Sequence, residues 1–224
     1  MEAPTFLGML IPSVPPYVSY SWLAIVFLIL IALIVRARLS LIPSGLQNFM
    51  EFIMEFIITQ ARDAVGPKSK TFIPLLGTLF LYILTCNLFG LIPGFESPTG
   101  NLNTNASLAV PVFFIYQFYG FKVHGIKYLG FFLGPIRNIY AIPFMLFMFI
   151  VEWISHLARP ITLSVRLFGN MMSKHLLLMV LGVLTPLLVP TLVLILGAAV
   201  SLIQAYIFMI LTAAYIGGAV EEHH

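Results

Sequence analysis

Long apolar stretches that contain almost no charge are the feature that most constrains how this chain can fold. The stretches from Tyr20 to Val35 and from Thr191 to Gly217 contain no Asp, Glu, Lys or Arg. A helix needs about 20 apolar residues to cross a bilayer. Charged residues make up 8% of the chain, which is too few to cover a surface in water, since soluble domains carry about 25%. The sequence therefore predicts an all-α integral membrane protein.

The predicted architecture is one N-terminal spanning helix, an interfacial amphipathic helix, two further spanning helices and a long tilted two-helix hairpin. The amphipathic helix has Glu51 and Glu55 on one side and Phe49 and Ile53 on the other, and we expect Ser44 to cap its start. We treat the chain as a single membrane domain, 1–224, made of the first segment and span (1–38), the amphipathic helix (44–65), spans two and three (71–119) and the hairpin (138–217).

The stretch 138–184 is too long for one upright span. Apart from Pro160 it contains almost no turn signal. A continuous helix of this length would measure roughly 70 Å, more than twice the apolar slab of ~30 Å. It is either two spans without a loop or one steeply tilted helix kinked near Pro160. We favour the tilted helix, followed by a break at 185–190 and a last helix over 191–217.

The distribution of basic residues predicts the topology. Segments 1–19, 93–105 and 185–190 contain no Lys or Arg. The alternation of spans places eight of the eleven basic residues on the other side, which is expected to be cytoplasmic. The N-terminus is then outside and the C-terminus cytoplasmic. These eight are Arg36, Arg38, Arg62, Lys68, Lys70, Lys122, Lys127 and Arg137.

The sequence predicts no cleaved signal peptide, no internal disulfide and no metal, cofactor or nucleic-acid partner. The first apolar run is preceded by no basic residue and followed by no cleavage site, so it is expected to be retained. The single cysteine, Cys86, excludes an internal disulfide and offers no metal cluster. No cofactor and no nucleic-acid partner is expected, because the basic residues are dispersed among loops.

Ionisable residues inside the long apolar stretch are candidates for function, because their burial in lipid is costly. Glu152, His156 and Arg159 are spaced i, i+4 and i+7 and so share one helix face. For this group a structural network and a functional path both remain open. Arg166 and Asn170 lie on a second stripe, 14 and 18 residues beyond Glu152.

Arg166 is expected to be a fixed charge near a carboxylate of another subunit. Arginine does not release its proton in proteins, and no acid of this chain lies near it on its own face. Glu152 and His175 flank it along the helix, which suggests a barrier between two half-pathways. On the last helix Ser201 and Gln204 share a small, polar face, and an antiparallel return brings Gln204 within a turn or two of Arg166.

Four motifs carry a specific resemblance. "LSVRLFGNM" (163–171), within "RPITLSVRLFGNMM", is preceded by "TCNLFGLIPG" (85–94) and the helix with Glu152, and followed by "LIQAYIFMILTAAYI" (202–216). In this order they resemble the a subunits of F-type ATP synthases, over essentially the whole chain from residue 41 onward.

The resemblance implies a non-catalytic stator subunit next to a ring of c subunits and bound to the b subunits of the peripheral stalk, with two half-channels that serve the ring carboxylates. The sequence shows no transit peptide, which favours a bacterial inner membrane, and the titratable His175 favours protons over Na⁺. Arg166 matches the family's essential arginine, Gln204 the glutamine close to it, and Asn170 and Glu152 channel-lining positions. The chain departs from the family pattern at His175, where some members have Glu, and at Gly197, where members with His carry an acid. Lys174 is also unexpected.

Two other functions remain open on the residues by themselves. A self-contained secondary transporter would show paired broken segments in two halves, and no second half is apparent. In a structural scaffold subunit the buried charges would only fix helix register. An enzyme is not predicted, because no nucleophile–base pair or metal-ligand set is apparent.

Overall fold

The computed structural model describes residues 14–92, 94–131, 142–185 and 188–221, and its regular elements there are all helices. The predictions for residues 1–13, Arg137, 138–141 and 222–224 lie outside the described residues. Four described helices are long and apolar enough to cross a membrane, which confirms an all-α membrane protein. The elements are α2 (Pro16–Ala37), α3 (Leu46–Val65), η1 (Gly66–Thr71), α4 (Ile73–Phe89), η2 (Pro98–Gly100), α5 (Leu102–His124), η3 (Gly125–Lys127), α6 (Tyr128–Phe131), α7 (Ile142–Leu184) and α8 (Leu188–Val220).

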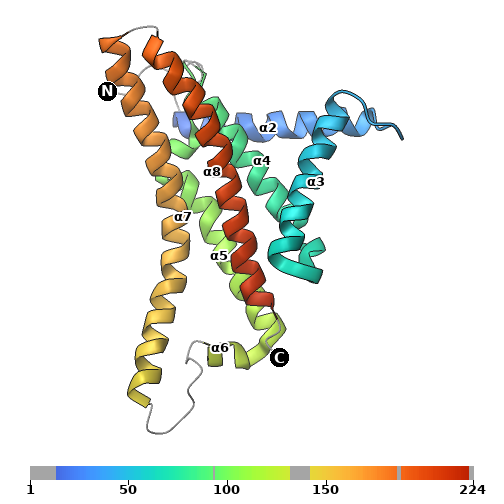
Figure 1. Ribbon diagram of the computed structural model, residues 1–224, viewed down its shortest axis with the longest axis vertical. Coiled ribbons are helices and arrows are strands. Elements are labelled where there is room, and N and C mark those ends of the chain that lie inside the picture. The colour runs from blue at the N-terminus through green and yellow to red at the C-terminus, as the bar shows by residue number, and fades with distance from the viewer. Residues whose placement is uncertain (1–13, 93, 132–141, 186–187, 222–224) are drawn as a thin grey trace.

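The hairpin is built from two long helices. α7 is a single α-helix of 43 residues with Pro160 inside it, which confirms the one-helix interpretation. Figure 1 shows α7 and α8 side by side along the long axis, while α2 runs across it. At 1.5 Å per residue α2 measures about 33 Å and α7 about 65 Å. α2 therefore matches an apolar slab of about 30 Å when upright, whereas α7 fits only when steeply tilted.

α4 and α3 correct two details of the sequence interpretation. α4 has 17 residues, or about 26 Å, and is shorter than the predicted second span. The chain before it, where Gly66 and Pro67 follow α3, forms the 3₁₀ turn η1 instead. The cap of α3 is Gly45 at φ 56°, without a side-chain hydrogen bond, rather than Ser44. Glycine adopts this left-handed conformation without strain.

α8 lies at the centre of the packing. It contacts α3, α4, α5 and α7, and α3 contributes the buried residues Ile57 and Ala61 to this core. α8 approaches α3 closely at Gly217, where a Cβ would collide with the carbonyl oxygen of Ala64. The core also includes Leu76, Phe80, Ile83, Val112, Tyr116, Leu163, Leu167, Ala205, Phe208, Met209, Ala213 and Ile216.

Candidate functional site

Arg166 points out of the subunit. Its side chain is exposed on α7 between apolar residues that are exposed too, Ile161 at 61% and Val165 at 50%. It forms no hydrogen bond or ion pair with any residue that the structure describes. An arginine in a membrane span is costly unless it has a partner. Within the described part of the chain this guanidinium is therefore left without a compensating charge.

Asn170 and Gln204 join the two long helices one turn from Arg166. The Nδ2 atom of Asn170 donates a hydrogen bond to Oε1 of Gln204 at 2.6 Å. Gln204 is 2% exposed. Since Asn170 follows Arg166 by four residues, the predicted return of Gln204 to the level of Arg166 is confirmed. Ser201, one turn before Gln204, is buried and donates to the carbonyl of Gly197 at 2.7 Å.

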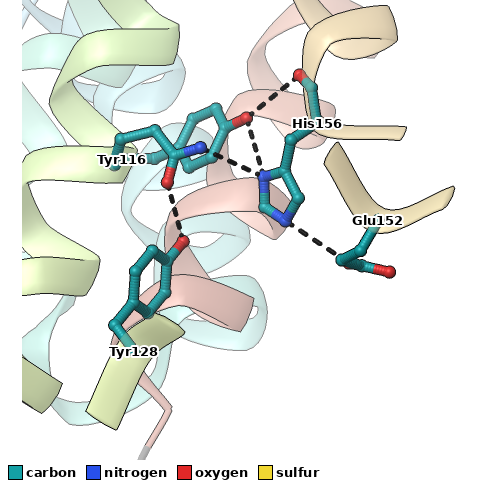
Figure 2. A network of polar contacts seen from close by, with 5 residues as sticks. Tyr116, Tyr128, Glu152 and His156 are labelled. Atoms are coloured by element: carbon teal, nitrogen blue, oxygen red, sulfur yellow. Dashed lines mark hydrogen bonds and ion pairs between the residues drawn. The ribbon is translucent and has the colours of Figure 1, made fainter. Parts of the chain in front are cut away.

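A second cluster surrounds His156, ten residues before Arg166 (Figure 2). Its Nε2 atom lies 3.4 Å from Oε1 of Glu152. Its Nδ1 atom lies 3.2 Å from the hydroxyl of Tyr116 and 3.4 Å from Nε2 of Gln117. The hydroxyl of Tyr128 donates to Oε1 of Gln117 at 3.0 Å. Side chains of α5 and α7 thus contact this imidazole, and α6 is linked to it through Gln117.

Arg159 belongs to the same cluster. Its guanidinium lies over the rings of Tyr116 and Tyr215, at 5.7 and 4.7 Å from their centroids. The shared face predicted for Glu152, His156 and Arg159 is confirmed. The partners on α5 and α8 were not predicted, because they lie far away in sequence.

Pro160 explains why Tyr116 contacts His156 twice. Proline has no N–H, so the carbonyl of the residue four positions earlier loses its helical hydrogen bond. That residue is His156. The hydroxyl of Tyr116 lies 3.4 Å from this carbonyl oxygen and donates to it. The proline therefore creates an acceptor inside α7 that a side chain of α5 satisfies.

Lys174 and His175 lie beyond Arg166 towards the other end of α7. Lys174 is 8% exposed, and its Nζ atom has no hydrogen-bond partner among the described residues. Its side chain crosses Gly197, where a Cβ would lie 3.0 Å from Cδ of Lys174. His175 is half-buried. The glycine at 197 therefore leaves room for the stem of the lysine.

A buried polar cluster near Gly90 was missed by the sequence interpretation. Thr99 donates to Oδ1 of Asn87 at 2.6 Å, and Asn105 donates to the carbonyl of Thr99 at 2.8 Å. Ser97 donates to the carbonyl of Cys86 at 2.9 Å. The signal was present in the small polar residues of "SPTGNLNTN" (97–105). The sequence analysis uses this segment only for its lack of Lys and Arg.

Metal binding finds no support in the part of the chain that the structure describes. Within residues 14–92, 94–131, 142–185 and 188–221 no group of three His, Cys, Asp or Glu side chains is placed to hold a metal ion. The fold and the clusters instead define a multi-pass helical membrane protein. Its polar side chains gather on α7 and on the helices that pack against it.

Comparison with known proteins identifies the family within that class. Residues 18–217 match the family model "ATP synthase A chain". "ATP synthase subunit a 2" of Syntrophotalea carbinolica is 45% identical over 93% of this chain and 87% of its own length. "ATP synthase subunit a" of Geobacter sulfurreducens is 45% identical over 92% of this chain and 88% of its own length. The chain therefore belongs to the ATP synthase A chain family.

Proposed function

We propose that this chain is the proton-translocating, non-catalytic stator subunit of a rotary F-type ATP synthase in a bacterial inner membrane. In this role α7 and α8 face the ring of c subunits, and the b subunits of the peripheral stalk bind elsewhere on the chain. Two half-channels serve the ring carboxylates and are separated by Arg166. The N-terminus lies outside and the C-terminus in the cytoplasm.

The outward guanidinium of Arg166 is the observation that carries the proposal. It lies in an apolar, exposed face without a partner among the described residues. A carboxylate of a neighbouring subunit would supply the missing charge. A fixed cation beside such an acid lowers its pKa and expels its proton. Each ring carboxylate would thus pass Arg166 in its ionised form, and protons would not cross directly between the half-channels.

The other site residues are assigned by their level on the two helices. Glu152, ~21 Å before Arg166 along α7, would line the cytoplasmic half-channel. His175, ~13 Å beyond Arg166, would line the outer one. Asn170, Gln204 and Ser201 would form the polar wall at the level of the arginine, which agrees with their hydrogen bonds and burial.

The test is ATP-driven acidification of inverted membrane vesicles from cells with wild-type or Arg166→Ala chain. Passive proton leak is measured in the same vesicles after removal of the catalytic sector. Thr162→Ala, an exposed position one turn before Arg166, is the matched control. We expect Arg166→Ala to abolish pumping in assembled complexes, with passive leak retained or raised.

Normal pumping by Arg166→Ala would contradict the proposal and favour a structural arginine. Solute movement by the chain reconstituted without other subunits would favour a self-contained transporter instead.

A further inference from the structure

His156 is surrounded by groups whose hydrogen-bonding roles can be assigned one after another. Among the described residues, Tyr116 and Gln117 of α5 and Glu152 of α7 contact the imidazole. Tyr128 of α6 contacts Gln117, and Arg159 of α7 lies over the rings of Tyr116 and Tyr215. Because a neutral imidazole donates from one nitrogen and accepts at the other, these roles decide where its proton lies.

The assignment begins at Tyr128. Its hydroxyl lies 3.0 Å from Oε1 of Gln117. Burial raises the pKa of Tyr128, an effect that Arg159 opposes and Glu152 reinforces. The hydroxyl donates to this amide oxygen, which can only accept. The amide of Gln117 therefore lies with its nitrogen towards His156.

The orientation of Gln117 then assigns Nδ1 of His156. The amide nitrogen of Gln117 lies 3.4 Å from Nδ1, and an amide nitrogen can only donate. Nδ1 must therefore accept, and it carries no proton. The hydroxyl of Tyr116 is compatible with this role, because it can donate to Nδ1 at 3.2 Å or to the carbonyl freed by Pro160 at 3.4 Å.

The remaining nitrogen of His156 faces Glu152. With Nδ1 as acceptor, the neutral ring carries its proton on Nε2, 3.4 Å from Oε1 of the carboxylate (Figure 2). An N–H at Nδ1 would point towards the donor nitrogen of Gln117 unless that amide turned over and gave up its bond from Tyr128.

We infer that His156 is a positioning residue that stays neutral during turnover and directs its Nε2–H at the carboxylate of Glu152. The inference rests on the proposed function, in which Glu152 lines the cytoplasmic half-channel. The imidazole then orients the acid and takes no part in carrying protons. Its Nδ1 atom is contacted by Tyr116 and Gln117 of α5, so the orientation of the carboxylate depends on the packing of α5 against α7.

The first test compares His156→Gln with His156→Leu in the intact complex. The amide of glutamine offers an N–H near the place of Nε2, whereas leucine offers none. The readout is the rate of ATP-driven acidification by inverted vesicles as a function of the pH at their outer, cytoplasmic face. Thr78→Ala, at an exposed hydroxyl on α4 away from the cluster, is the control.

We expect His156→Gln to keep the wild-type pH profile with a rate within about twofold, and His156→Leu to lose about tenfold, as expected when an acid is misplaced. The inference would be overturned if the rate of the wild type changed with pH in a range where the rate of His156→Gln did not. That result would mean that the imidazole of the wild type gains and loses a proton in this range. A His156→Leu variant with wild-type rate and profile would overturn it too.

The second test does not depend on pumping. Solid-state ¹⁵N NMR of the complex with ¹⁵N-histidine in this chain, minus the spectrum of His156→Gln, isolates the signals of His156. We expect the neutral Nε2–H form at pH 7, and an imidazolium in Gln117→Glu, which places a carboxylate beside Nδ1. An imidazolium or an Nδ1–H form in the wild type would refute the inference. Arg166→Ala should leave this spectrum unchanged, so a failure of the proposed function would be recognised separately.

Discussion

Replacement of Lys174 by methionine is expected to stabilise the chain, although it removes a charged residue from a helix of the hairpin. Lys174 is 8% exposed, and its Nζ atom is without a hydrogen-bond partner among the described residues. Burial of a charge without a partner opposes folding. Methionine keeps an unbranched side chain of similar length across Gly197 and removes the ammonium group.

The size of the effect follows from the position of Lys174 on α7. A lysine at the centre of a spanning helix costs about 2.5–3.5 kcal/mol. Lys174 lies ten residues before the end of α7 at Leu184, about 15 Å along the helix axis, so part of this cost applies. We expect a gain of about 1–2 kcal/mol, or a factor of 5–30 in the ratio of folded to unfolded protein.

The assay is SDS-induced unfolding of the purified chain in mixed micelles, followed by tryptophan fluorescence. Lys127→Met is the control, because Lys127 is exposed in η3 and its replacement should change stability by less than about 0.5 kcal/mol. A midpoint of Lys174→Met below that of the wild type would refute the reasoning. The ammonium would then be held by a stabilising partner, such as ordered water or an anion.

Three further outcomes test other contacts. Double-mutant cycles of Asn170→Leu and Gln204→Leu, read by the same unfolding assay, should give a coupling of about 0.6–1.7 kcal/mol, and zero coupling would contradict their hydrogen bond. Gly217→Ala should destabilise by about 1–3 kcal/mol, since its Cβ meets the backbone of α3, whereas Gly218→Ala has open space and should not. The pKa of Tyr128 is raised in the folded chain. The neutral hydroxyl therefore contributes fully to the free energy of unfolding below about pH 10, and this contribution is lost as the pH rises through the raised pKa. Absorbance at 295 nm, wild type minus Tyr128→Phe, should show this late ionisation, and a normal titration would contradict it.

The predictions from sequence succeeded where counting along a helix was sufficient. The return of Gln204 to the level of Arg166 followed from two helices joined by a short break, whereas its hydrogen bond with Asn170 was not predicted. The length of α7 followed from the lack of turn signals around Pro160. Hydropathy did not reveal that α4 ends at Phe89, because apolar residues continue into the turn that follows.

The partners of His156 could not be read from the sequence for a different reason. Tyr116 and Gln117 precede it by 40 and 39 residues, and an unpredicted element, α6, supplies Tyr128. Such contacts depend on how α5 lies across α7, which helix periodicity does not specify. The loop polar residues around Thr99 were missed likewise, because their burial arises only when η2 packs against α2, α4, α5 and α7.

Because α7 is one continuous helix, it fixes the axial spacing and the relative orientation of Glu152, Arg166 and His175. No loop lies between these three residues to absorb a change in length. One inserted residue would rotate the part of α7 that follows it by about 100° and shift it by about 1.5 Å. Each of these residues that follows the insertion would then face a different neighbouring helix. Four inserted residues would nearly restore the orientation of the side chains but would increase their axial separation by about 6 Å. Variation along this helix is thus confined to exchanging side chains at constant length.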